Sequence, residues 1–326
     1  MSKIIIPSPD KWINKPYRSH INNNKSTQIF FGGSSSGKTF FLAQRTVIDM
    51  LEGGRNYLIL RKVQRDCRRS VWNEILKVMR SLRYKNGSLI SMCDINKSEL
   101  IIKFPNGYQI FFGGLDDRER IKGIVPQKGV ITDIWMEEAT EFHADDLKQL
   151  EKRLRGETKE GINKRTILSF NPIIKTHWIY QKWFDDWDED KTEYIDDRLS
   201  ILKTTYKDNK FLTDDDIERL LSEEDHYYIE VYVKGNWGVL GNVIFTNWKT
   251  KDLSDKIKQF DNIFYGLDWG FYPDPFAFVK MHIDEKRNKI YIFDELYLYQ
   301  RTNDTVIEKV KEKYDGGRRI VADSAE

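Results

Sequence analysis

Residues 29–41 read IFFGGSSSGKTFF, in which Gly32 and Gly37 frame a serine run that ends in Lys38 and Thr39. The apolar run before the glycines predicts a buried strand over 27–31, and the residues after them predict a helix over 40–51. A G-x4-G-K-T pattern between a strand and a helix is typical of a loop that binds phosphates. The sequence therefore predicts an α/β domain around a phosphate-binding loop, with an ordinary Gly/Ser turn as the alternative.

Each part of this loop has an expected role. Glycines let the backbone curl so that successive N–H groups point inward, and the helix N-terminus adds a partial positive charge. We expect Lys38 to neutralise the β- and γ-phosphates and the Thr39 hydroxyl to ligate Mg²⁺. The predicted nucleotide-binding loop comprises Gly32, Gly33, Ser34, Ser35, Ser36, Gly37, Lys38 and Thr39.

Two adjacent acids, Glu137 and Glu138, follow an apolar strand predicted over 130–136. A phosphate-binding loop that hydrolyses nucleotide needs acidic partners at the end of a neighbouring strand. We expect Glu137 to hold Mg²⁺, and Glu138 to orient and deprotonate the attacking water. Two solvated glutamates at the start of a helix are the alternative.

The segment ILSFNP ends another strand, predicted over 166–170. Ser169 and Asn171 are polar side chains at that strand end, where they are placed to sense the γ-phosphate. Pro172 stops the strand because the residue before a proline is restricted. A plain strand-ending turn is the alternative.

The order of elements suggests a motor-type ATPase. A strand over 57–60 and a hairpin over 99–114 separate the loop from the acids, so we expect an extra strand between the two phosphate-binding strands. The nearest match to a guanine-reading Asn-Lys-x-Asp is 163–166, which lacks the Asp, so ATP is favoured over GTP. Residues of about 194–240 are expected to form a mixed, mainly helical lid or linker, and 241–261 a connector.

Many segments, in order, resemble the large terminase subunit of tailed bacteriophages. Those that resemble its ATPase domain are GGSSSGKT, LRKVQRDCRRSVWNEI, GLDDRERIKGI, IWMEEA, SFNPIIKTHW, TYKDN and VKGNWGVLGNVIF. GLDWGFYPDP and VADSAE resemble its nuclease domain. The resemblance implies an ATPase domain over 1–240 that translocates double-stranded DNA into the procapsid, and a ribonuclease H-like nuclease that cuts concatemeric DNA.

The resemblance also implies partners and a location. These are the portal protein, the small terminase subunit and other copies in a homo-oligomeric ring, in the host bacterial cytoplasm and transiently on the procapsid. No place in the mature virion is expected.

An arginine often present in the family's phosphate loop is a serine here, so we expect Arg61 or a neighbouring subunit to supply the charge-stabilising arginine.

The block 262–326 has two aspartates at predicted strand ends that could form a metal site. Asp268 ends its first predicted strand, and Asp323 ends a strand that follows a helix predicted over 304–314. In a ribonuclease H-like sheet these strands are neighbours, so the two carboxylates would share Mg²⁺ or Mn²⁺ for phosphodiester hydrolysis. Capping or turn roles are the alternative. Asp294 and Glu326 are further candidate acids for the same nuclease site.

The resemblance implies that the family's nuclease continues beyond Glu326 with a further carboxylate. We therefore expect this domain to be truncated, and the chain to retain nucleotide binding while cutting DNA poorly or not at all.

Charge is unevenly distributed, although 53 basic and 51 acidic residues give a net charge of only +2. The segment from Arg61 to Lys85 contains nine basic residues and only two acidic ones. Such a segment is suited to contact a phosphate backbone, and Arg65, Arg68 and Arg69 are the expected DNA contacts. A solvated helix face is the alternative.

Other functions remain to be distinguished. A small-molecule kinase would need an acceptor pocket, which no segment suggests, and a non-catalytic assembly protein would not need Glu137 and Glu138. The two cysteines have no metal-ligand spacing, the five histidines form no cluster in sequence, and no apolar run is long enough for a membrane span.

Overall fold

The computed structural model describes residues 4–84, 87–238, 252–270, 275–299, 301–316 and 318–322. The chain divides into two compact units, Met1–Val243 and Ile244–Glu326. Within the described ranges, no helix is long and apolar enough to cross a membrane.

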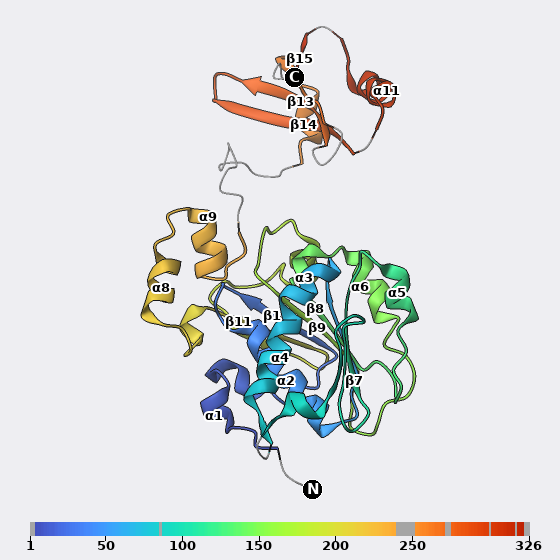
Figure 1. The fold of residues 1–326 in the computed structure, drawn as a ribbon. Coiled ribbons are helices and arrows are strands. Elements are labelled where there is room, and N and C mark those ends of the chain that lie inside the picture. Colours follow the sequence, from blue (N-terminus) through green and yellow to red (C-terminus); the bar gives the residue numbers. More distant parts are fainter. Residues whose placement is uncertain are drawn as a thin grey trace. The chain divides into compact units, whose positions relative to one another are not determined.

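The first unit contains most of the helices and strands (Figure 1). Its α-helices are α1 (Pro9–Trp12), α2 (Lys38–Glu52), α3 (Gln64–Arg69), α4 (Val71–Ser81), α5 (Arg118–Gly123), α6 (Ala144–Glu151), α7 (Trp178–Trp183), α8 (Asp214–Leu221) and α9 (His226–Tyr228). Its shorter helical turns are η1 (Lys15–His20), η2 (Leu89–Met92), η3 (Ala139–Glu141), η4 (Tyr206–Asp208) and the π-helical η5 (Ile229–Val233). Its strands are β1 (Thr27–Gly32), β2 (Tyr57–Arg61), β3 (Arg83–Tyr84), β4 (Gly87–Ser88), β5 (Asp94–Asn96), β6 (Ile101–Lys103), β7 (Gln109–Gly114), β8 (Asp133–Glu137), β9 (Arg165–Phe170), β10 (Glu193–Ile195) and β11 (Leu199–Thr204).

A nine-stranded sheet in the order β10-β11-β1-β9-β8-β2-β7-β6-β5 forms the centre of this unit. The strands from β11 to β7 run parallel, and β10, β6 and β5 are added antiparallel at the edges. Since the central strands are parallel, their carboxyl ends lie at one edge of the sheet. The phosphate loop after β1, the acids after β8 and the polar residues after β9 are therefore brought together.

The expected extra strand lies between β1 and β8, but it is β9, which follows the acids in the sequence. The strand at 57–61, which precedes the acids, lies on the far side of β8. β9 pairs with β1 on one side and with β8 on the other, so that Ser169 lies opposite Glu137. The polar end of β9 is thus placed between the loop and the acids.

Residues of about 194–240 were expected to be mixed and mainly helical, and this prediction is wrong for their first part. Leu199–Thr204 form β11, a parallel neighbour of β1. Polar residues interrupt the apolar pattern of this strand, yet Ser200, Lys203 and Thr204 are buried. Their partners are far away in sequence; Lys203, for example, donates to Asn236 Oδ1 at 2.6 Å. After the short turn η4, the helical part begins at α8.

Two apolar cores cover the two faces of the sheet. Phe30 packs in one core with residues of α2 and α4, which Figure 1 shows lying across the sheet. Phe31, the next residue of β1, packs in the other core with residues of α6 and α7. The alternation follows from the period of two in a strand, and it holds the loop that follows β1 between two packed layers.

The second unit has a four-stranded sheet in the order β14-β13-β12-β15. Its described elements are α10 (Ser254–Ile257), β12 (Ile263–Asp268), β13 (Phe276–Asp284), β14 (Lys289–Leu298), α11 (Asn303–Lys313) and β15 (Ile320–Ala322). Val306 and Val310 of α11 pack on Tyr265, Phe276 and Phe278 of the sheet. Of the predicted connector 241–261, residues 241–251 lie outside the described residues.

Candidate functional site

Close backbone contacts fix the loop between β1 and α2. A side chain at Gly32, whose φ is +138°, would place a Cβ 1.9 Å from the carbonyl oxygen of Thr204. The N–H of Gly33 donates to that carbonyl at 2.9 Å, and the N–H of Ser34 donates to the carbonyl of Tyr232 at 2.7 Å. The end of β11 and the π-helical turn therefore hold the loop, and only glycine fits its first position.

Lys38 is buried at the centre of this loop. Its Nζ donates to the carbonyl of Gly33 at 2.8 Å, to that of Gly32 at 3.2 Å and to Ser36 Oγ at 3.1 Å. Burial lowers the pKa of Lys38 to about 8, whereas the charges of Glu138 and Glu137 favour its protonated form. The ammonium group is thus desolvated and bound by neutral oxygens, which an anion would replace favourably.

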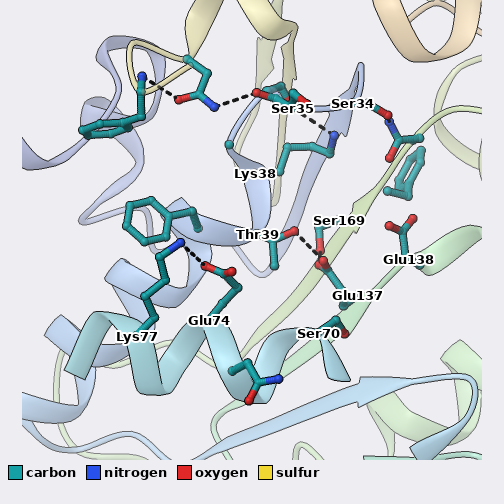
Figure 2. Close-up of a pocket in the computed structure, with 18 of the residues that line it drawn as sticks. Ser34, Ser35, Lys38, Thr39, Ser70, Glu74, Lys77, Glu137, Glu138 and Ser169 are labelled. Atoms are coloured by element: carbon teal, nitrogen blue, oxygen red, sulfur yellow. Dashed lines mark hydrogen bonds and ion pairs between the residues drawn. The ribbon is translucent and has the colours of Figure 1, made fainter. Parts of the chain in front are cut away.

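Glu137 joins three elements of the site. Figure 2 shows Thr39 and Ser169 pointing toward its carboxylate. Thr39 Oγ1 donates to Oε1 at 2.5 Å, Ser169 donates to Oε2, and Trp135 Nε1 donates in turn to Ser169 Oγ at 2.6 Å. Burial, and then the charge of Glu138, raise the pKa of Glu137 to about 7, against the hydrogen bonds from Ser169 and Thr39.

Glu138 has a different environment from its neighbour. It follows the last residue of β8 with φ at +51°, a left-handed conformation that is costly for a residue other than glycine. The turn directs its half-buried side chain away from the Thr39–Glu137 hydrogen bond and into the same cavity (Figure 2). The two acids are therefore adjacent in sequence but face different parts of the site.

Asn171 and Arg61 reach the site from other strands. Asn171 Nδ2 donates to the carbonyl of Gly32 at 2.9 Å, so the end of β9 touches the loop as well as Glu137. Arg61, at the end of β2, lines the cavity and donates from Nη2 to Glu141 Oε1 at 2.7 Å. Burial opposes the charge of Arg61, but the hydrogen bond and charge of Glu141 outweigh it and raise its pKa.

A cavity of about 1030 Å³ is lined by most of these groups. Its lining residues are Trp12, Ser34, Ser35, Ser36, Gly37, Lys38, Thr39, Phe40, Arg61, Arg69, Ser70, Asn73, Glu74, Lys77, Ser81, Glu137, Glu138, Ser169, Phe170, Asn171, Asn209, Phe211 and Leu212. Both acids, Ser169, Asn171, Arg61 and the loop residues from Ser34 to Thr39 are therefore brought together. Gly32 and Gly33 do not line the cavity, but their carbonyls accept from Lys38.

The site fits a phosphorylated ligand and a divalent cation. A curled loop with a glycine at φ +86° (Gly37) opens a helix, and a buried ammonium group lies within it. The hydroxyl of Thr39 and the carboxylate of Glu137 supply the oxygen donors that Mg²⁺ prefers. These two oxygens already lie within hydrogen-bonding distance of each other.

Several residues at the site were missed by the sequence analysis. Tyr17 OH donates to the carbonyl of Ser36 at 3.1 Å, and Asn209 Nδ2 donates to that of Ser35 at 2.7 Å. Glu141, the partner of Arg61, was not singled out. Asn209, in the TYKDN motif, was expected either in a lid that reports nucleotide state or in a plain turn, but no contact with the loop was predicted for it. Tyr17 lies ten residues before β1 and had no signal in the sequence.

The expected DNA contacts differ from one another. The side chain of Arg65 is 72% exposed, and Arg68 is also exposed, with Nη2 donating to the carbonyl of Lys97 at 2.7 Å. Arg69 instead lines the cavity. Of the three, Arg65 and Arg68 do not line the cavity.

The acids of the second unit are only partly described. Asp268 is exposed at the end of β12, which pairs in parallel with β15. The register places Leu267 opposite Ala322, the residues before Asp268 and Asp323. Asp323 and Glu326 lie outside the described residues. Asp294, a further candidate acid, is on β14 and forms an ion pair with Lys313 of α11. Among the residues that are described, no group of three or more His, Cys, Asp or Glu is arranged to hold a metal ion.

Comparison with known proteins identifies the family. A family model described as phage terminase large subunit matches residues 24–236, more than half of the chain. The chain belongs to the phage terminase large subunit family. It is 30% identical over 311 residues to the large terminase subunit of Bacillus phage SPP1, a match that covers 91% of this chain and 70% of that protein.

A further curated relative agrees with this assignment, and a solved structure shares the fold. The PBSX phage terminase large subunit of Bacillus subtilis is 27% identical over 339 residues, which cover 97% of this chain and 75% of that protein. The structure of a large terminase from a thermophilic bacteriophage, in complex with ADP, has the same fold. It matches with a TM-score of 0.52 and 17% identity, over 95% of this chain and 75% of that one.

Proposed function

We propose that the first unit hydrolyses ATP and uses the energy to translocate double-stranded DNA into a procapsid. The observation that carries this proposal is the junction at Glu137, where Thr39 of α2 and Ser169 of β9 donate to one carboxylate. Membership in the terminase family and the ADP complex of the thermophilic phage protein support it.

The loop and its lysine bind and orient the phosphates. Backbone N–H groups at the start of α2 and the Nζ of Lys38 face the anion, and the lysine exchanges its loop carbonyls for phosphate oxygens. Thr39 and Glu137 would hold Mg²⁺, which neutralises charge on the phosphate oxygens. Glu138 accepts a proton from the attacking water at its carboxylate. Arg61 is placed to oppose negative charge at the same end of the cavity.

β9 is positioned to pass the state of the site onward. Ser169 contacts Glu137, and Asn171 contacts the Gly32 carbonyl, so one strand end is bonded to both the acid and the loop. The loop is bonded in turn to the π-helical turn through Tyr232. A rearrangement of these bonds would therefore move the turn Ile229–Val233, which lies near the end of the first unit in the sequence.

We propose DNA contacts at Arg65 and Arg68, which are exposed on α3. Contacts of this kind are made to phosphates, so binding should tolerate any sequence and weaken steeply with salt. The small terminase subunit, the portal protein and a ring of further copies are the proposed partners, in the host bacterial cytoplasm and transiently on the procapsid.

We propose a second activity for the other unit, metal-dependent cutting of concatemeric DNA. The parallel pairing of β12 with β15, one residue short of Asp268 and Asp323, supports it. The exposed Asp268 carboxylate is a suitable oxygen ligand for Mg²⁺ or Mn²⁺.

The fate of the γ-phosphate tests the first proposal against the rival classes. With γ-labelled ATP, we expect the label to be released as inorganic phosphate, in proportion to turnover. Transfer of the label to a metabolite would indicate a kinase, and binding of ATP without release would indicate an assembly protein.

A further inference from the structure

Tyr17 lies behind the phosphate loop, outside the cavity. It belongs to η1 and is completely buried, and it is not among the residues that line the cavity. Its ring stacks on Phe41 of α2, with centroids 4.6 Å apart and planes at 16°. Its hydroxyl donates to the carbonyl of Ser36 at 3.1 Å and therefore accepts from Thr204 Oγ1 at 2.8 Å. One hydroxyl group thus connects the N-terminal segment to the back of the loop.

This hydrogen bond sets the direction of the peptide group between Ser36 and Gly37. A trans peptide is planar, so its carbonyl and its N–H point in opposite directions. The carbonyl of Ser36 points toward Tyr17 in the core, and the N–H of Gly37 therefore points away from the core. Because Gly37 lines the cavity, this N–H faces the space in which we place the phosphates.

The N–H groups of the loop differ in what they donate to. Those of Gly33 and Ser34 donate to the carbonyls of Thr204 and Tyr232. Among the residues that the structure describes, none accepts a hydrogen bond from the N–H of Gly37. An N–H without an intrahelical partner at the start of a helix favours an anion. Gly37 therefore has a donor left for a phosphate oxygen.

The sequence of the loop does not fix this orientation by itself. Gly37 has φ at +86°, and the backbone of a glycine rotates at little steric cost. Ser36 is buried, so its carbonyl needs a hydrogen-bond partner. Without the hydroxyl of Tyr17, we expect this carbonyl to turn toward water in the cavity, which turns the N–H of Gly37 away from the phosphates.

We propose that Tyr17 is a positioning residue for the phosphate loop, and that it holds the 36–37 peptide so that the N–H of Gly37 donates to a phosphate oxygen. The inference rests on the proposed function, since it concerns the phosphates of the same nucleotide. A donor that already points at the anion gains affinity, because the loop does not have to rearrange when the ligand binds. Core packing is a separate role, which the ring of Tyr17 fulfils through Phe41.

Tyr17→Phe removes the hydroxyl and keeps the ring. Mg·pyrophosphate is the probe, because it carries phosphates and no base. We expect calorimetry to show about tenfold weaker binding in Tyr17→Phe, which corresponds to the loss of one hydrogen bond. Tyr57→Phe is the matched control, because Tyr57 is equally buried and its hydroxyl donates to Asp49 and accepts from Arg165. Tyr57 begins β2 and so lies at the edge of the sheet opposite the loop. Its variant should lose stability but bind pyrophosphate as the unmodified chain does.

The amide of Gly37 gives a second readout, which a role in core packing would not change. Ser36 and Gly37 form the only Ser-Gly pair in the sequence. Isotopic labelling of the serine carbonyl carbon and the glycine nitrogen therefore selects this one amide in an NMR spectrum. An N–H that donates to a charged oxygen is deshielded. We expect saturating Mg·pyrophosphate to move the Gly37 proton downfield in the unmodified chain, and to move it less in Tyr17→Phe.

Each outcome has a separate meaning. Unchanged pyrophosphate affinity in Tyr17→Phe would overturn the proposal, and so would an equal loss in Tyr57→Phe, because lost stability would then explain both. A Gly37 proton that does not move when pyrophosphate binds to the unmodified chain would also overturn it, and this result needs no variant. Failure of the unmodified chain to bind pyrophosphate would instead contradict the proposed function itself. Thermal unfolding curves check that both variants are folded at the temperature of the titration.

Discussion

Thr39 and Glu137 are joined by a hydrogen bond of 2.5 Å that connects the first turn of α2 to the end of β8. Ser169 of β9 donates to the other oxygen of the same carboxylate. Three elements that surround the proposed nucleotide thus meet at a single buried acid. A change in the charge of that acid is transmitted to all three.

Ser169→Ala should shift the pH dependence of ATP hydrolysis. The hydrogen bond from Ser169 lowers the pKa of Glu137, which burial has raised to about 7. Its loss raises this pKa further, so less of Glu137 is ionised at neutral pH. We expect the acid limb of the rate profile to move to higher pH and the rate at pH 7 to fall. A profile that keeps its shape in Ser169→Ala would contradict this role.

Arg61→Ala should lower kcat by roughly 10²-fold, the cost of losing one preorganised donor at developing charge. Nucleotide affinity should change little, because the loop and Lys38 supply the phosphate contacts. Arg65→Ala, four residues along the chain and exposed, is the matched control when the assay contains no DNA. Full turnover by Arg61→Ala would transfer the role to an arginine of a neighbouring subunit.

Asp49→Asn should destabilise the first unit. Asp49 of α2 is buried and pairs with Arg165 of β9, and it accepts a hydrogen bond from Tyr57. Removing one member of a buried ion pair costs about 3 kcal/mol or more in the free energy of unfolding. Urea unfolding at pH 7 measures this, with the exposed Asp145→Asn as control.

The same pair has a defined pH dependence. Burial alone would raise the pKa of Asp49, but the charges of Arg165 and Arg45 outweigh it and hold the pKa below its ordinary value of 3.8. Its contribution to stability is therefore complete above about pH 4 and is lost as pH falls through the folded-state pKa. Asp49→Asn should flatten the acid limb of the stability curve; an unchanged limb would exclude Asp49 as its source.

Asp268→Asn should remove a Mn²⁺ site from the second unit. Of the two aspartates proposed to bind the metal, only Asp268, exposed at the end of β12, lies within the described residues. Titration followed by electron paramagnetic resonance, without nucleotide, counts bound Mn²⁺. We expect fewer bound ions in Asp268→Asn than in Asp304→Asn, an exposed aspartate on α11. Equal counts would argue against a metal role for Asp268.

The phosphate loop and the acids were predictable because their signals are local. Gly32, Gly37, Lys38 and Thr39 lie within eight residues, and the parallel-strand rule alone places Glu137 at the same edge of the sheet. The extra strand between β1 and β8 was also expected, although sequence order suggested the wrong segment for it. Strand order depends on pairing between distant segments, which a single sequence does not display.

The missed features all depend on contacts across long stretches of chain. Ser200, Lys203 and Thr204 made β11 look polar, and only their distant partners explain how these side chains are buried. Tyr17 and Glu141 act on the site through Ser36 and Arg61, respectively. No periodicity or motif marks such pairs.

The most direct test is the steady-state rate of ATP hydrolysis, measured with and without linear duplex DNA. Glu138→Gln supplies the blank, and Glu119→Gln, an exposed glutamate on α5, is the matched control. We expect a rate that Glu138→Gln lowers by about 10²-fold or more, that Glu119→Gln leaves unchanged, and that rises when DNA is added. Absence of any Glu138-dependent turnover, with or without DNA, would contradict the proposal that this chain is an ATP-hydrolysing motor.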